Sequence, residues 1–93
     1  HMTLANTLVM LARTEGFLGH YQQKKQWLKQ ALSIELAHYG EQHPEIALTL
    51  KNLANAHGEL GNNRKKLTLI QQTLQIRKNY YGENHPLVAI ALH

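Results

Sequence analysis

The chain has 93 residues, which allows one domain at most and leaves room for only a small hydrophobic core. Charged residues make up 17%, below the roughly 25% of average usage, so the composition does not indicate disorder. The formal net charge of +4 permits acidic partners without demanding them. Cysteine is absent, which excludes disulfides and thiolate metal sites. No apolar run approaches the length of a signal or membrane segment. We therefore expect a cytoplasmic protein with no membrane partner.

The first two residues, His1 and Met2, resemble the remnant of a cloning site. We expect residues 1–2 to come from a vector and residues 3–93 to form the domain. The chain is then expected to be a fragment of a longer protein.

A six-residue motif occurs twice at a fixed spacing. YGEQHP begins at Tyr39 and YGENHP begins at Tyr81, an offset of 81 − 39 = 42 residues. Identical pairs at this offset are mostly apolar or glycine and include Leu8/Leu50, Leu11/Leu53, Ala12/Ala54, Gly16/Gly58 and Leu18/Leu60. Because the other positions vary freely, the repeat is a packing unit. We expect repeat one at residues 3–43, repeat two at 44–85 and a partial third repeat at 86–93.

Each repeat predicts two helices joined by a turn. In repeat two, Pro44 and Glu45 favour a helix start, and Gly58, Gly61 and the following asparagines favour a turn. The turn reading also applies to Gly16 and Gly19 of repeat one. We expect helices near residues 3–16, 21–38, 45–58, 64–80 and 86–92.

The apolar stripes predict the core. Each second helix carries two stripes, so it must be covered by its own first helix and by the first helix of the next repeat. The first-helix stripes are Leu4, Leu8, Leu11 and Ala12 in repeat one, and Ile46, Leu50, Leu53, Ala54 and His57 in repeat two. The second-helix stripes are Trp27, Leu28, Ala31, Leu32, Ile34 and Leu36 in repeat one, and Leu67, Leu69, Ile70, Thr73, Leu74, Ile76 and Tyr80 in repeat two.

The pattern L-x-x-LA-x-x-x-G-x-LG followed by YG-x-x-HP resembles the tetratricopeptide repeat in its 42-residue, kinesin-light-chain-type form. The resemblance covers essentially the whole chain. It implies an all-α fold, an α-α superhelix built as a solenoid of two antiparallel helix hairpins plus a C-terminal capping helix. It also implies a concave groove, lined by the first helices, that binds a peptide segment of a partner protein. The chain departs from the family at Lys24 and Lys66, where a small residue usually makes a tight helix contact.

The displayed stripes of the first helices are the predicted partner-binding surface. They carry Asn6, Val9, Met10, Arg13 and Phe17 in repeat one, and Leu48, Lys51, Asn52, Asn55 and Glu59 in repeat two. The resemblance implies that an asparagine matching Asn52 holds a peptide backbone, and that a lysine four residues before an asparagine, as Lys51 and Asn55 stand here, can bind a carboxylate. Because a solvated face rarely gathers so much apolar surface, we expect the ligand to carry an apolar side chain. Arg13 and Lys51 favour an acidic residue close to it.

Basic segments offer an alternative surface. Lys24-Lys25 and Arg64 to Lys66 recur one repeat apart, so they could form a ridge that binds nucleic acid or another polyanion. No aromatic residues interleave with them, which favours solvated helix starts. Nucleic acid is therefore the less favoured partner.

No catalytic, cofactor or metal signature is present in the sequence, so we expect neither an enzyme nor a bound cofactor. His57 falls on a buried stripe and is expected to be a core residue with one hydrogen bond. Two and a part repeats fall short of the roughly three usually needed for a stable stack. We therefore expect either a homo-oligomer formed through the exposed repeat ends or, alternatively, coverage of those ends by neighbouring repeats of the parent protein.

Overall fold

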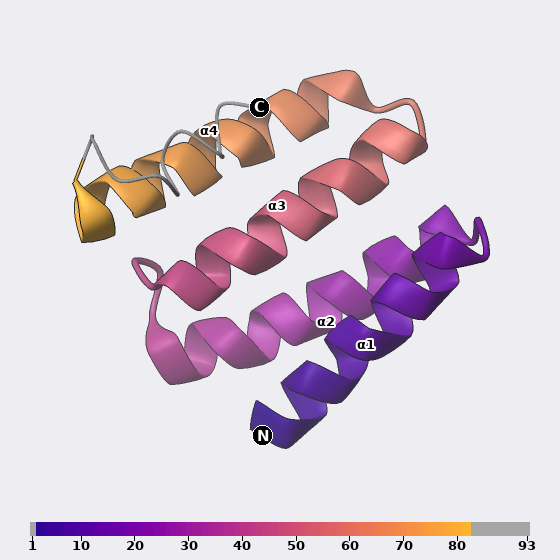
Figure 1. Cartoon of the computed structure of the whole chain (residues 1–93), viewed down its shortest axis with the longest axis horizontal. Helices are drawn as coiled ribbons and strands as arrows, with labels where there is room; N and C mark the ends of the chain where they lie inside the picture. The colour runs from indigo at the N-terminus through magenta and orange to yellow at the C-terminus, as the bar shows by residue number, and fades with distance from the viewer. Residues whose placement is uncertain (1, 83–93) are drawn as a thin grey trace.

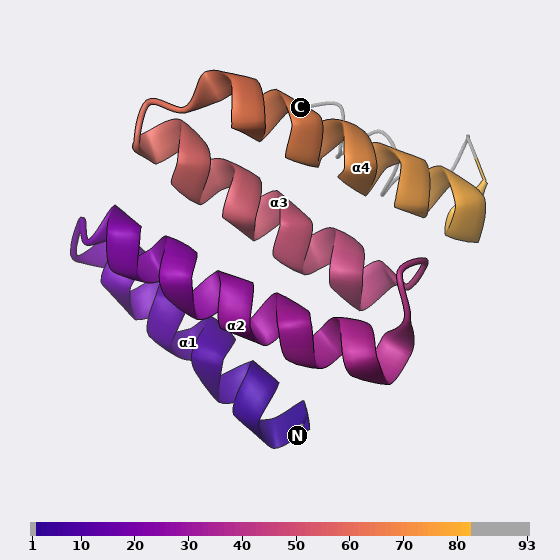
Figure 2. The same cartoon turned by 180° about the vertical axis from the view of Figure 1, so that it is seen from behind.

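The structure is a computed structural model that describes residues 2–82, and these residues form four α-helices without strands. The helices are α1 (Met2–Phe17), α2 (Tyr21–Tyr39), α3 (Pro44–Glu59) and α4 (Asn63–Tyr81). Successive helices run antiparallel and each packs against the next (Figure 1). Figure 2 shows the same order from behind, with α3 between α2 and α4. The predicted all-α hairpins are confirmed, with every helix end within one residue of its expected place. The capping helix expected at 86–92 lies outside the described residues.

Both hairpins turn through the same backbone hydrogen bond. After α1, the N–H of His20 donates to the carbonyl of Glu15 over 2.7 Å, and after α3 the equivalent bond measures 2.8 Å. The glycine before each donor has a positive φ, 82° at Gly19 and 85° at Gly61. Only glycine adopts this conformation at little cost, which explains why it recurs at the repeat offset.

Gly16 and Gly58 are not turn residues, contrary to the prediction. They lie near the ends of α1 and α3, where a lysine from the following helix crosses the backbone. A Cβ atom at Gly16 would lie 2.8 Å from Cδ of Lys24, and one at Gly58 would lie 2.7 Å from Cδ of Lys66. The glycines therefore make room for the two lysines. The prediction failed because a glycine's partner on the next helix cannot be identified from local sequence.

The core runs along the contacts between successive helices. Its buried apolar residues are Ala5, Leu8, Ala12, Leu28, Ala31, Ile46, Ala47, Leu50, Leu53, Ala54, Ala56, Leu69 and Ile76. The helix α2 packs against both α1 and α3, as the two stripes on the second helix predict. Trp27 is partly buried against this core, as expected.

Several residues expected in the core are exposed. Leu4 and Leu11 on α1 are 53% and 43% exposed, whereas their equivalents on α3, Ile46 and Leu53, are 2% and 4% exposed. The difference arises because α2 covers this side of α3, while no helix of the described part covers the same side of α1.

Three residues on the second helices were also misplaced in the core. Leu36 is exposed because it lines an open cavity. Leu67 and Tyr80 of α4 are each 57% exposed. The stripes therefore overestimated burial at these three positions.

The repeated loop joins the two hairpins as the motif predicts. Pro44 is the first residue of α3, and Nδ1 of His43 accepts the N–H of Glu45 over 3.1 Å. The His43 ring also stacks on Tyr39, with centroids 4.0 Å apart. Gly40 has a φ of 81°, which lets α2 end and the chain reverse.

A buried polar pair fixes how α3 is rotated against α2. The Thr49 hydroxyl donates to the carboxylate of Glu35, and both side chains are buried. Burial raises the pKa of Glu35, and the hydrogen bond from Thr49 opposes that rise. With Thr49 turned inward, the adjacent Leu48 points away from α2 and is exposed.

Candidate functional site

The predicted binding residues lie on α1 and α3. We call them the α1/α3 face. Seven are exposed, namely Asn6, Met10, Arg13, Phe17, Leu48, Asn55 and Glu59, and three are half-buried, namely Val9, Lys51 and Asn52. The face is therefore open along most of its length, but its members differ in how far they can reach a partner.

Arg13 and Asn52 are brought together from different helices. Both line a cavity of about 230 Å³ between α1, α2 and α3. Its other lining residues are Ala12, Gly16, Lys24 and Leu28. A guanidinium group supplies several N–H donors, and the amide of asparagine both donates and accepts. The cavity can therefore hold the carbonyl or carboxylate groups of a peptide.

An apolar hollow adjoins this cavity on α1. It measures about 510 Å³ and is lined by Met10, Arg13, Thr14, Phe17 and Leu18. Phe17 is 93% exposed, more than any other large apolar side chain in residues 2–82. Because Arg13 lines both hollows, apolar and polar recognition meet at one side chain.

Sequence reasoning missed the residues that lie between the predicted stripes. Thr14 and Leu18 border the apolar hollow, and Gly16 and Lys24 border the polar cavity. The repeated pair Leu18/Leu60 was a signal for Leu18, but it was attributed to packing. Lys24 could not be found because it comes from α2, outside the first helices.

Some predicted residues have other contacts. Val9 packs against the core, and Glu59 forms an ion pair in which Nζ of Lys24 lies 2.9 Å from its Oε1. Lys51 and Asn55 do not line either of these two hollows. Within the predicted set, the geometry thus favours Met10 and Arg13 over the lysine–asparagine pair.

The basic ridge is reduced by the same ion pair. Lys24 is paired with the carboxylate of Glu59. The aliphatic stems of Lys24 and Lys66 pack against Gly16 and Gly58. The remaining members, Lys25, Arg64 and Lys65, have no carboxylate partner within residues 2–82. These cations are available to an anionic ligand.

His57 is a core residue, as expected. It is 6% exposed, and its Nδ1 lies 3.5 Å from Nδ2 of Asn62. Its Nε2 is buried without a hydrogen-bond partner. No group of three or more potential metal ligands gathers among the described residues. Within the same part of the chain, every helix is too short or too polar to cross a membrane.

The two hairpins share the same turn, the same glycine contacts and the buried pairs Ala5/Ala47, Leu8/Leu50 and Ala12/Ala54, which defines a helical-repeat protein. A family model described as tetratricopeptide repeat matches residues 4–45 and 46–87. The chain therefore belongs to the tetratricopeptide repeat family, in its 42-residue, kinesin-light-chain-type form. Repeats of this family generally mediate protein–protein interaction, and the family is a non-catalytic scaffold. A search of curated proteins found no match to the chain.

Proposed function

We propose that the chain binds a peptide segment of a partner protein along the α1/α3 face, which would form the concave groove of the stack. The main support for this proposal is the position of Arg13, which lines both the apolar hollow and the polar cavity that it shares with Asn52. A peptide crossing this point can bury an apolar side chain and pair its polar groups at once. The family's general role in protein–protein interaction supports the same conclusion.

The ligand is a segment with a large apolar residue and an adjacent acidic one. Met10 and Phe17 are the most exposed apolar side chains of the hollow, so burying them against a partner supplies the hydrophobic gain. The Arg13 guanidinium can pair with the carboxylate. The half-buried amide of Asn52 can hold the peptide backbone, as the family resemblance implies.

The test uses peptides selected from a random displayed library against the whole chain. The double substitution Arg13→Ala with Asn52→Ala is expected to weaken their binding by about 1 to 3 kcal/mol, because it removes two hydrogen-bonding side chains. The substitution Arg64→Ala is the matched control, since Arg64 is exposed and lies outside the α1/α3 face. Unchanged affinity in the double variant, with normal helicity, would place the binding surface elsewhere.

Binding of nucleic acid through the basic ridge is the alternative. It predicts that a single-stranded oligonucleotide binds at low salt and dissociates steeply as salt rises. No binding at low salt would eliminate it.

A further inference from the structure

The helix α3 also has a side that faces α2 and α4. At about 100° per residue, Ile46, Leu50 and His57 fall within roughly 40° of one another around the helix axis. Leu48 and Asn52 of the α1/α3 face lie about 200° and 240° from Ile46 in the same count. Whatever lies over Ile46, Leu50 and His57 is therefore separate from the proposed peptide groove.

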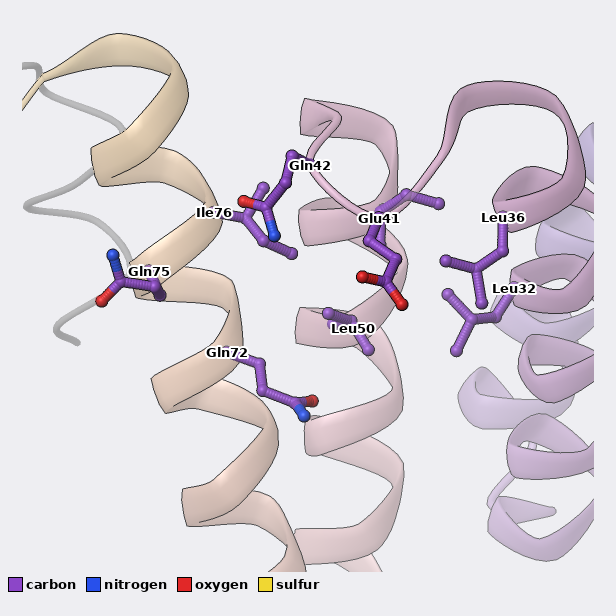
Figure 3. A pocket seen from close by; sticks show the side chains of 9 residues that line it. Leu32, Leu36, Glu41, Gln42, Leu50, Gln72, Gln75 and Ile76 are labelled. Atoms are coloured by element: carbon purple, nitrogen blue, oxygen red, sulfur yellow. The ribbon is translucent and has the colours of Figure 1, made fainter.

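A cavity of about 390 Å³ opens over one end of this side. Its apolar lining is Leu32 and Leu36 of α2, Ile46 and Leu50 of α3, and Ile76 of α4. Figure 3 shows Leu32 and Leu36 on one flank, Gln72 and Ile76 on the other, and Leu50 between them. The volume lies near the lower end of the range for ligand pockets, about 300 to 1,000 Å³, and suits one large side chain.

The rim of this cavity is polar. Gln42 accepts a hydrogen bond from Asn79 over 3.0 Å, and Gln75 donates to Asn79 over 3.0 Å, so these amides are already paired. Gln72 and Glu41 have no hydrogen-bond or ion-pair partner within residues 2–82. The cavity therefore offers an apolar floor, a free amide and one carboxylate.

Lysines gather at the other end of the same side of α3. Helical spacing puts Lys25 and Lys29 on the side of α2 that carries Leu32 and Leu36, and it puts Lys65 in line with Gln72 on α4. None of these three lysines forms an ion pair with a described residue. We call the surface from the cavity to these lysines the α2/α4 trough.

The charges of the three lysines also act on His57, which lies on the same side of α3 as Ile46 and Leu50. Burial lowers the pKa of His57, and the charges of Lys25, Lys29 and Lys65 lower it further. Three cations from two helices thus act on one buried ring whose Nε2 has no partner. Such a concentration of positive charge attracts an anionic group.

We propose that the α2/α4 trough is a second binding surface, one that takes an acidic segment of a partner protein anchored by one aliphatic side chain. The aliphatic side chain fills the cavity at Leu50, and the acidic residues lie over the lysines near His57. Leu50 and His57 are seven positions apart, which is about 10 Å along the helix. An extended segment rises about 3.3 Å per residue, so the anchor and the first acidic residue stand about three positions apart.

Charge sets the direction of the segment. Glu41 at the cavity end repels an acidic group, while the lysines at the far end attract it. A nucleic acid strand has phosphates along its whole length and no aliphatic anchor, so it fits the lysine end alone. An acidic protein segment matches both ends.

The test is a titration of the ¹⁵N-labelled whole chain, followed by amide chemical shifts. The probe is a blocked ten-residue synthetic peptide with one leucine and two aspartates that begin three positions after it. We expect the largest shifts at Lys25, Lys29, Lys65 and Ile76. Two matched peptides, leucine changed to alanine and aspartates changed to asparagine, are each expected to bind at least tenfold more weakly.

Variants test the same assignment from the protein side. Lys25→Glu with Lys65→Glu should weaken peptide binding at least tenfold, whereas Arg64→Ala, which removes a cation about 100° away from Lys65 around α4, should leave it unchanged. The single substitution Lys29→Gln, which keeps a polar side chain, should weaken it several-fold and provides the test if the double variant loses helicity. Absence of shifts at millimolar peptide, or shifts confined to the α1/α3 face, would overturn the proposal. So would an oligothymidylate that shifts the trough amides with equal or higher affinity.

Discussion

The ammonium group of Lys24 lies 2.9 Å from the carboxylate of Glu59, and this ion pair joins the start of α2 to the end of α3 across the repeat boundary. The stem of Lys24 packs against Gly16 in the same arrangement that Lys66 makes with Gly58. Lys66 forms no ion pair with the described residues, so the two lysines form a matched pair that differs in one interaction.

Lys24→Met should therefore destabilise the protein more than Lys66→Met. Both substitutions keep an unbranched stem against glycine, but only the first removes an ion pair, in which Lys24 is half-buried and Glu59 is exposed. We expect an additional loss of up to about 1 kcal/mol in the free energy of unfolding for Lys24→Met. Urea denaturation measures it, and the difference should shrink in 1 M NaCl. Equal effects of the two substitutions would show that the ion pair contributes nothing.

Leu11 and Leu53 occupy the same place in the two repeats but not the same environment. Leu53 is 4% exposed and Leu11 is 43% exposed. Leu53→Ala should cost about 2 to 5 kcal/mol because it opens a cavity in the core. Leu11→Ala should cost well under half of that, since its side chain already contacts water. Similar losses in thermal or urea unfolding would contradict the packing described for α1.

The exposed side of α1 also predicts self-association. Leu4, Leu11 and Leu18 follow one another at seven-residue intervals and are all exposed. Ile46 and Leu53, the equivalents of Leu4 and Leu11, are buried by α2. A second copy could cover the exposed α1 leucines with a helix of the same kind. We expect light scattering to show a mass that rises with concentration, and Leu11→Asp to abolish that rise. Leu48→Asp, on the α1/α3 face, is the control. A strict monomer at high concentration would contradict this prediction.

The 42-residue repeat accounts for how much of the fold could be predicted. Helix ends followed from Pro44 and from glycines that need a positive φ, because these features are local to the chain. Exposure was harder to predict, because Leu4 and Leu11 have the same sequence pattern as their buried equivalents. Whether a stripe is covered depends on which helix lies beside it, and the repeat pattern does not give that.

The candidate site was predictable only in part, for a similar reason. Helical spacing found Met10, Arg13 and Asn52, which line the two hollows. It could not find Lys24, which reaches the polar cavity from α2. It also missed the α2/α4 trough, because the stripe of Leu32 and Leu36 was interpreted entirely as core.

The buried histidine predicts a specific dependence of stability on pH. The pKa of His57 is lowered in the folded protein, so the folded state binds fewer protons than the unfolded state below about pH 6.5. His57 therefore contributes a loss of stability as the pH falls from about 6.5 through its folded pKa. Relative to His57→Gln, the melting temperature of the unmodified chain should fall more between pH 7.5 and pH 5. Parallel pH profiles would show that His57 does not titrate on unfolding.

The most direct measurement of the central claim is to map where a selected peptide contacts the chain. The peptide is the strongest binder from the random library, and the readout is the change in amide chemical shifts of the ¹⁵N-labelled chain. If the α1/α3 face is the peptide groove, the largest shifts will fall at Met10, Arg13, Phe17 and Asn52. Largest shifts confined to α2 and α4, or a library that yields no binder, would contradict the claim.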